Sequence, residues 1–82
     1  MEAPPRWTEP FQTPEFDEYT LVYSGKMQVE VDGQTHVLEA KQSILVKGGS
    51  RVRYSNPFDQ PSHYCSVCIP AFSPETVNRE EN

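Results

Sequence analysis

Basic residues are scarce in this chain of 82 residues. The sequence has 7 Lys and Arg against 12 Asp and Glu, which gives a formal net charge of −5, and it contains no basic cluster. A surface with this charge repels the phosphate backbone of nucleic acids. We therefore do not expect nucleic acid as a partner.

Long apolar runs are also missing. No segment approaches the roughly 20 apolar residues of a membrane span, so no membrane association is expected. The first residues are acidic and rich in proline, whereas a signal peptide has a basic stretch followed by an apolar one. The expected compartment is the cytoplasm.

Hydrophobic residues and glycine are few, which limits the size of the core. Hydrophobic residues make up 35% of the chain and aromatic residues 11%, with 8 Pro and 4 Gly. This composition is lean for a globular domain, yet the middle of the chain is too regularly patterned for a disordered one. A chain of this length has room for one domain, and its many prolines favour short strands joined by turns.

The chain divides into three stretches. Residues 1–16 contain four prolines with Trp7 and Phe11 between them, which predicts an extended arm or an edge strand. The two aromatic side chains are expected to dock on this domain or on a second copy of it. Residues 17–72 carry the strand pattern. Residues 73–82 form a short tail, whose opening Ser-Pro pair is typical of a helix start and allows one or two helical turns.

Alternation of apolar and polar side chains predicts six short strands in the middle stretch. The turn Asp32-Gly33 is typical of a tight hairpin, because both residues adopt positive φ at low cost. Either Val37 or Leu38 is expected to face the core. Strands of this length and spacing predict an all-β domain, a small antiparallel sandwich or barrel. The predicted strands cover residues 17–24, 26–32, 34–38, 43–47, 51–55 and 63–69.

The segment from Glu18 to Asn56 resembles the cupins, a family of small jelly-roll-like double-sheet barrels. The first cupin motif ends with a Glu and a Gly separated by six residues, and an alternating strand and an Asp-Gly turn follow. Glu18, Gly25 and the turn Asp32-Gly33 fit this spacing. The ending at residues 68–74 also looks like that of small single-domain cupins. The resemblance implies the fold but not the activity, because cupins include enzymes and non-catalytic binders.

The second cupin motif is only partly present. Gly49 and Asn56 match it, whereas Lys41 stands where Gly is usual and Lys47 stands where Pro is usual. The motif also carries a metal-binding His, and this position maps onto Val52.

The metal ligands of the family are mostly absent. A cupin metal site uses two His shortly before the Glu, the Glu itself and the second-motif His. The positions of the His pair fall among residues 11–14, none of which is His, so Glu18 is the one remaining ligand. A single carboxylate does not hold a transition metal. We expect no metal and no other cofactor, unless Gln12 or nearby side chains join Glu18.

The two cysteines, Cys65 and Cys68, have the spacing of a C-x-x-C motif. They lie in a predicted strand, where residues three apart point to opposite faces. The spacing therefore favours two free thiols over a disulfide or a zinc site.

Strand parity, together with the cupin resemblance, indicates which side chains face the interior. The resulting pocket has apolar and hydroxyl groups, as suits a small neutral or weakly polar ligand. His36 is expected at the surface, whereas His63 begins the last strand and is a candidate for the pocket rim. Arg51 and Arg53 are expected to point outward, where Glu30 or Glu39 offers a cross-strand partner. The expected ligand-binding residues are Gln12, Thr13, Glu18, Thr20, Val52, Tyr54, Tyr64, Ser66 and Cys68.

Two functional hypotheses follow. The first is a small, metal-free cupin that binds a small molecule without catalysis. The alternative is a small cupin isomerase, epimerase or lyase that uses Glu18 with Tyr54 or His63 as acid and base. The sequence favours the first hypothesis, because no second carboxylate or His is placed beside Glu18.

A homodimer is also expected. The outward face of the strand at residues 17–24 carries Tyr19, Leu21 and Tyr23, an apolar stripe of the kind that marks an interface. The arm adds Trp7 and Phe11, which can pack on the sheet edge of a second copy. The competing possibility is a monomer in which the arm folds back over its own barrel.

Overall fold

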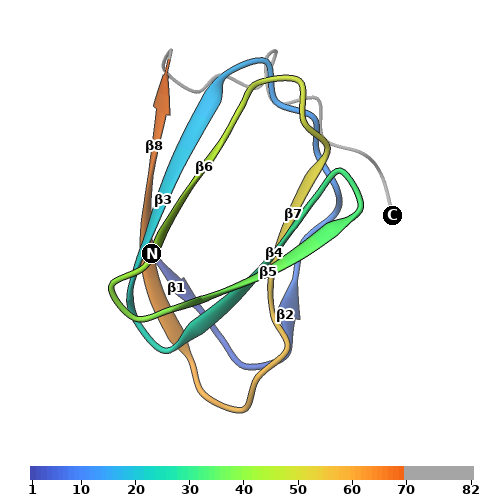
Figure 1. Ribbon diagram of the computed structural model, residues 1–82. Coiled ribbons are helices and arrows are strands. Elements are labelled where there is room, and N and C mark those ends of the chain that lie inside the picture. The colour runs from blue at the N-terminus through green and yellow to red at the C-terminus, as the bar shows by residue number, and fades with distance from the viewer. Residues whose placement is uncertain (70–82) are drawn as a thin grey trace.

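The structure, a computed structural model, describes residues 1–69 and has two four-stranded antiparallel sheets. One sheet has the order β1-β8-β3-β6 and the other β2-β7-β4-β5, and the two face each other as layers (Figure 1). Residues 1–69 contain no helix, and the expected all-β double-sheet fold is confirmed, although the sheets do not join into a closed barrel. The strands are β1 (Glu2–Ala3), β2 (Trp7–Thr8), β3 (Asp17–Ser24), β4 (Lys26–Val31), β5 (Gln34–Glu39), β6 (Ser43–Val46), β7 (Val52–Asn56) and β8 (Ser62–Ile69).

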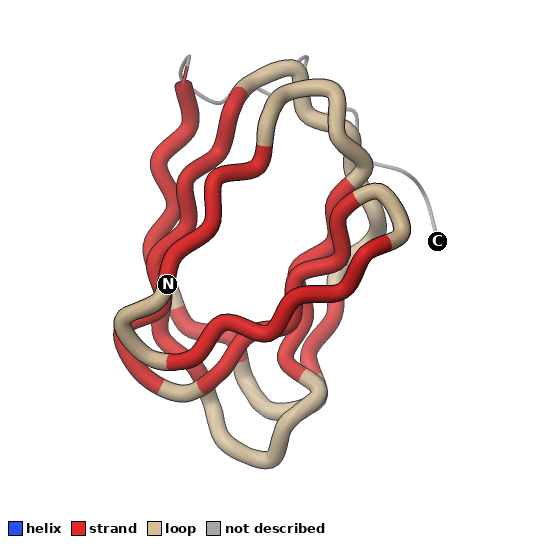
Figure 2. The backbone as a smooth tube through the Cα atoms, in the orientation of Figure 1, coloured by secondary structure: helices blue, strands red, loops and turns tan. Residues whose placement is uncertain are grey.

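The predicted strands agree with these bounds to within one residue at each end. Figure 2 shows that the strands form both walls of the sandwich and that loops connect them. The helical turns expected in residues 73–82 lie outside the described residues. In the described part of the chain no helix is long and apolar enough to cross a membrane.

The chain passes from the first sheet to the second at Gly25. This residue has φ +76°, and a Cβ there would lie 2.6 Å from the carbonyl oxygen of Pro61. Residues that carry a side chain rarely adopt such a φ, and the neighbouring backbone of Pro61 leaves no space for a side chain here. Glycine at this position therefore lets β4 start directly after β3, next to the chain entering β8.

The β4–β5 hairpin has the predicted turn. Val31 pairs with Gln34, so only Asp32 and Gly33 lie between the strands. Their φ values of 48° and 85° are both positive, as a two-residue hairpin of this kind requires. Following the turn, Leu38 is buried at 7% exposure whereas Val37 is 48% exposed, which settles which of the two faces the core.

Lys41, in the turn between β5 and β6, departs from the usual cupin glycine without changing the backbone. Its φ is 72°, in the left-handed region that glycine favours. Its backbone nitrogen donates a hydrogen bond to the carbonyl oxygen of Val22, and Val22 in turn donates to the carbonyl oxygen of Gln42. These bonds hold the turn against β3 despite the side chain at position 41.

The N-terminal arm docks on its own domain. Its first strand, β1, pairs with β8, and β2 pairs with β7, so the arm adds an edge strand to each sheet. Trp7 packs against the core. The Phe11 ring lies under two guanidinium groups, with Arg51 at 3.7 Å and Arg53 at 4.3 Å from the ring centroid. Trp7 and Phe11 of the arm therefore pack on the domain of their own chain.

The core lies between the two sheets and contains side chains from both. It extends from the first residues of the chain to β8, so the arm is part of it. The buried members are Ala3, Val22, Met27, Val29, Leu38, Val46, Val52 and Tyr54, with Trp7, Val31, Ile44 and Tyr64 packed around them.

Asn56 connects the arm to the loop between β7 and β8. Its side chain is fully buried, and its amide nitrogen donates to the carbonyl oxygens of Ala3 (3.0 Å), Pro4 (3.2 Å) and Gln60 (2.8 Å). Its amide oxygen accepts from the backbone nitrogen of Phe58 at 3.2 Å. One buried side chain therefore holds two irregular segments in place.

We predict that Asn56→Ala lowers the free energy of unfolding by at least about 2 kcal/mol, because it leaves several buried backbone groups without a partner. Urea denaturation measures the change, and the exposed Gln34→Ala is the matched control, expected to lie within about 0.5 kcal/mol of the wild type. Equal stability of the two variants would contradict the role assigned to Asn56.

Candidate ligand-binding site between the sheets

The pairing of β3 with β8 brings polar side chains together on the inner face of the first sheet. Glu18 lies opposite Cys68, Thr20 opposite Ser66, and Val22 opposite Tyr64. Since side chains directly across an antiparallel pair share a face, these residues line the same wall. Strand parity assigned Tyr64, Ser66 and Cys68 to the interior, and the structure places them there, leaving Val67 and Ile69 exposed at 54% and 61%.

A chain of hydroxyl groups crosses from one sheet to the other. The hydroxyls of Ser66 and Thr20 are 2.9 Å apart, and Thr20 donates to the phenol oxygen of Tyr54, on β7, at 3.2 Å. Because Thr20 uses its proton for Tyr54, Ser66 supplies the proton of the other bond. The phenol proton of Tyr54 is thereby left for an acceptor on the Glu18 side.

The Glu18 carboxylate is only partly satisfied. Its Oε2 accepts from the Cys68 thiol at 3.7 Å, and the Tyr54 phenol is placed to donate to the same carboxylate, whereas its Oε1 is buried and accepts no hydrogen bond from residues 1–69. A buried carboxylate oxygen without a donor costs free energy unless something else supplies the hydrogen bond. This atom is therefore a candidate point for a hydrogen-bond donor from a ligand.

Glu9 is a second carboxylate near this site, which sequence reasoning missed. Its charge acts on the phenols of both Tyr54 and Tyr64, and its Oε2 accepts from the Gln12 amide at 3.2 Å. Glu9 lies in the arm, eight residues before the first predicted strand and in no recognisable pattern. Only the docking of β2 against β7 brings it here, and no spacing in the sequence signals that contact.

The two tyrosines of the site are held in their neutral form. Burial, followed by the charge of Glu18, raises the pKa of Tyr54 far above its ordinary value. Burial and the charges of Glu9 and Glu18 also raise the pKa of Tyr64. Both phenols therefore remain protonated at neutral pH and act as hydrogen-bonding groups rather than as bases.

The remaining residues predicted to bind the ligand are Gln12, Thr13 and Val52, and they differ in how they relate to the polar side chains around Glu18. Val52 is fully buried in the core, and its backbone forms a two-bond bridge with Gln12, at 3.0 and 2.8 Å. Gln12 is buried at 5% exposure and points its amide at Glu9. Thr13 is half-buried beside it. Gln12 is thus connected to the site through its hydrogen bond to Glu9, whereas the Val52 side chain contributes only an apolar surface.

Neither histidine joins the site. His63 lies on the other face of β8 from Tyr64, half exposed, with its Nε2 3.8 Å from the Glu2 carboxylate. It pairs with Ser24 and Glu2, whereas Glu18 pairs with Cys68 at the opposite end of β8. The expectation that His63 rims the pocket is therefore not met, because strand parity turns it outward. His36 is exposed on β5, as expected.

The arginines and cysteines follow strand parity. Arg53 pairs with Glu30, its Nη2 2.8 Å from Oε1, on the outer face of the second sheet. Both Cys65 and Cys68 are free thiols, and they sit on opposite faces of β8. Only Cys68 contacts the interior group.

Comparison with known proteins identifies the family. The sequence model described as "Cupin domain" matches residues 1–69. The chain belongs to the cupin family. Among solved structures, a Cupin_2 domain of an XRE family transcriptional regulator from Enterobacter cloacae has 24% identity and a TM-score of 0.74, covering 82% of this chain and 73% of that one. A cupin 2 conserved barrel domain protein from Salinispora arenicola has 19% identity and a TM-score of 0.75, covering 82% and 56%. These likenesses establish the shared fold.

A curated relative is closer in sequence. The Myxococcus xanthus protein named endoribonuclease YbeY is 44% identical over 80 residues, which are 98% of this chain and 27% of that protein. The cupin described here therefore spans about a quarter of that relative's length.

The residues of this cupin do not fit the metal of the family. Within residues 1–69 no three His, Cys, Asp or Glu side chains lie close enough to share an ion. The neighbours of Glu18 are a thiol and hydroxyls, and Val52 occupies the position of the second-motif His. Gln12, the side chain that could have joined Glu18 as a ligand, directs its amide nitrogen to Glu9. We therefore assign no step to a metal.

We predict that Cys68 is alkylated by iodoacetamide more slowly than Cys65 near pH 8. Burial and the neighbouring Glu18 charge raise the pKa of the Cys68 thiol, so the reactive thiolate forms only at higher pH. Glu18→Gln removes the charge and should accelerate alkylation of Cys68 at fixed pH. Mass spectrometry of tryptic peptides follows each thiol, and Cys65 is the internal control. A Cys68 rate unaffected by Glu18→Gln would be the contrary result.

Proposed function

We propose that this cupin binds a small molecule between its sheets, without a metal and without catalysis of its own. The observation that supports the proposal is the buried Oε1 of Glu18, which accepts no hydrogen bond from residues 1–69, although the Tyr54 phenol is placed to donate to the same carboxylate. A ligand that donates a hydrogen bond there satisfies an atom that the protein itself leaves unpaired.

The charges around the site favour one class of ligand. Glu9 and Glu18 both act on Tyr54, and the ion pairs of Arg6, Lys47 and Arg53 use other carboxylates. A carboxylate or phosphate ligand would meet two negative charges. A small neutral polyol or an amine, by contrast, can donate to Glu18 and rest its carbon atoms against the tyrosine rings.

The enzyme alternative has less support. Glu18 and Tyr54 are neighbours, but His63 is on the outer face of β8. The raised pKa of Tyr54 makes its phenol a poor proton donor and excludes it as a base near neutral pH. Glu18 would need Glu9, the second carboxylate near this site, as its acid–base partner, and Glu9 accepts a hydrogen bond from Gln12. Non-catalytic binding is therefore the simpler function for this set of residues.

The name of the Myxococcus relative does not change this proposal. That name describes a whole protein of which this cupin corresponds to 27%. Cleaving RNA requires contact with a phosphodiester, and this chain has a net charge of −5 with two carboxylates at its candidate site. We propose that the cupin region binds a small molecule in the cytoplasm.

The ligand class can be tested with three small probes in ¹H–¹⁵N NMR titrations of the full chain. Ethanolamine and glycerol donate hydrogen bonds to a carboxylate, whereas glycolate carries a negative charge. We expect ethanolamine and glycerol to shift the amide signals of Thr20 and Ser66, and glycolate to leave them unchanged. Glu18→Gln should weaken ethanolamine binding about tenfold, because a charged hydrogen bond is lost.

The exposed Glu39→Gln removes the same charge elsewhere and is the matched control, expected to bind ethanolamine as the wild type does. Melting curves of both variants confirm that they are folded. Binding of glycolate in preference to ethanolamine, or equal binding by the Glu18 and Glu39 variants, would refute the proposed ligand class.

We also propose that the cupin is a homodimer through the outer face of the β8-β3-β6 part of the first sheet. Leu45, Tyr19 and Val67 lie in one row across three strands, exposed at 49%, 45% and 54%. The ion pair between Asp17 and Lys47 lies beside this row. An apolar row without charged side chains resembles the centre of a protein interface, and a second copy of the same face meets it without opposing like charges.

Light scattering behind a sizing column tests the dimer. We expect twice the chain mass of 9.4 kDa for the wild type, and the single-chain mass for Tyr19→Glu. Val37→Glu, at an equally exposed apolar residue of the other sheet, should remain dimeric. A monomeric wild type, or a Tyr19→Glu variant that still dimerises, would exclude this face as the interface.

A further inference from the structure

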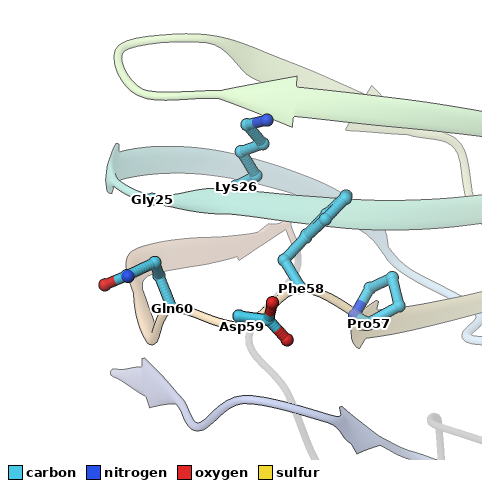
Figure 3. A pocket seen from close by; sticks show the side chains of 6 residues that line it. All are labelled: Gly25, Lys26, Pro57, Phe58, Asp59 and Gln60. Atoms are coloured by element: carbon cyan, nitrogen blue, oxygen red, sulfur yellow. The ribbon is translucent and has the colours of Figure 1, made fainter.

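A hollow lies outside the sandwich, at the end where β3 passes into β4. It has a volume of about 430 Å³ and is bordered by the start of β4 and by the loop between β7 and β8. Figure 3 shows the Phe58 side chain and Lys26 on neighbouring walls, with Asp59 and Gln60 on the loop. The lining residues are Gly25, Lys26, Pro57, Phe58, Asp59 and Gln60.

The walls of this hollow are held in place by the fold. The buried Asn56 side chain bonds the backbone of both Phe58 and Gln60, which fixes the loop at two points. On the other wall, Gly25 lies so close to Pro61 that no side chain fits between them. A site with preformed walls does not lose affinity to the ordering of a loop.

The charges of the hollow leave one cation available. Asp59 forms an ion pair with Arg6, so the carboxylate on the loop already has its partner. The ammonium nitrogen of Lys26 lies 5.4 Å from the centroid of the Phe58 ring. Glu39 is the cross-strand neighbour of Lys26 in β5, but within residues 1–69 these two side chains form no ion pair.

We propose that this hollow binds a small carboxylate with a flat apolar body, such as an aromatic acid. The ring of the ligand packs against Phe58, and its carboxylate meets the ammonium group of Lys26. The charge preference is opposite to that of the interior, where two carboxylates disfavour an acid. This proposal is independent of the function proposed for the interior.

The probe is benzoate, added to the full-length chain and followed by ¹H–¹⁵N NMR, with benzyl alcohol as its neutral counterpart. We expect saturable shifts at the amides of Gly25 and Phe58 with benzoate, and much weaker ones with benzyl alcohol. Lys26→Gln should weaken benzoate binding about fivefold, as expected for the loss of an exposed charge pair. Phe58→Leu should also weaken it, because the aromatic contact is lost.

Lys47→Gln removes the same charge at a distant site and should bind benzoate as the wild type does. Unchanged Thr20 and Ser66 signals would show that the interior is not involved. Three results would overturn the proposal: no saturable shift at Gly25 and Phe58, equal binding of benzyl alcohol, or equal binding by the Lys26 and Lys47 variants.

Discussion

The pairing of β3 with β8 is the constraint on which the rest of the molecule depends. It places Glu18 opposite Cys68 and Thr20 opposite Ser66 on the inner face. The same register puts Tyr19 and Val67 together on the outer face. A slip of one residue in either strand would exchange the two faces of that strand, which would expose the hydroxyl chain and bury the apolar row. The candidate ligand site and the candidate interface therefore share one structural cause.

Period-two alternation made much of the fold predictable. It located the strands and the turn at Asp32-Gly33, and it assigned Tyr64, Ser66 and Cys68 to the interior. Alternation is a local property of an extended chain, so it shows in the sequence without knowledge of distant contacts.

Other parts of the site could not be predicted, because they depend on contacts between segments far apart in the sequence. Glu9 approaches the tyrosines only because β2 pairs with β7. The role of Asn56 arises from carbonyl oxygens at Ala3 and Gln60, neither of which has a recognisable sequence signal. His63 was assigned to the rim by its place at a strand end, although parity turns it toward Glu2.

The distribution of charge gives this cupin three chemically distinct surfaces. Carboxylates act on the interior, Lys26, which forms no ion pair within residues 1–69, borders the outer hollow, and the outer face of the first sheet is apolar at its centre. The family's metal-binding histidines are absent, and Glu18 acts as a hydrogen-bond acceptor for the Cys68 thiol. A binder of neutral or amine-bearing molecules is what such an interior best supports.

The most direct test of this central claim is a crystal structure of the cupin grown with ethanolamine. The ligand should lie between the sheets, with its nitrogen or hydroxyl oxygen about 3 Å from Oε1 of Glu18. An interior without ligand at saturating ethanolamine, or Oε1 hydrogen-bonded instead to another side chain of the protein, would contradict the claim.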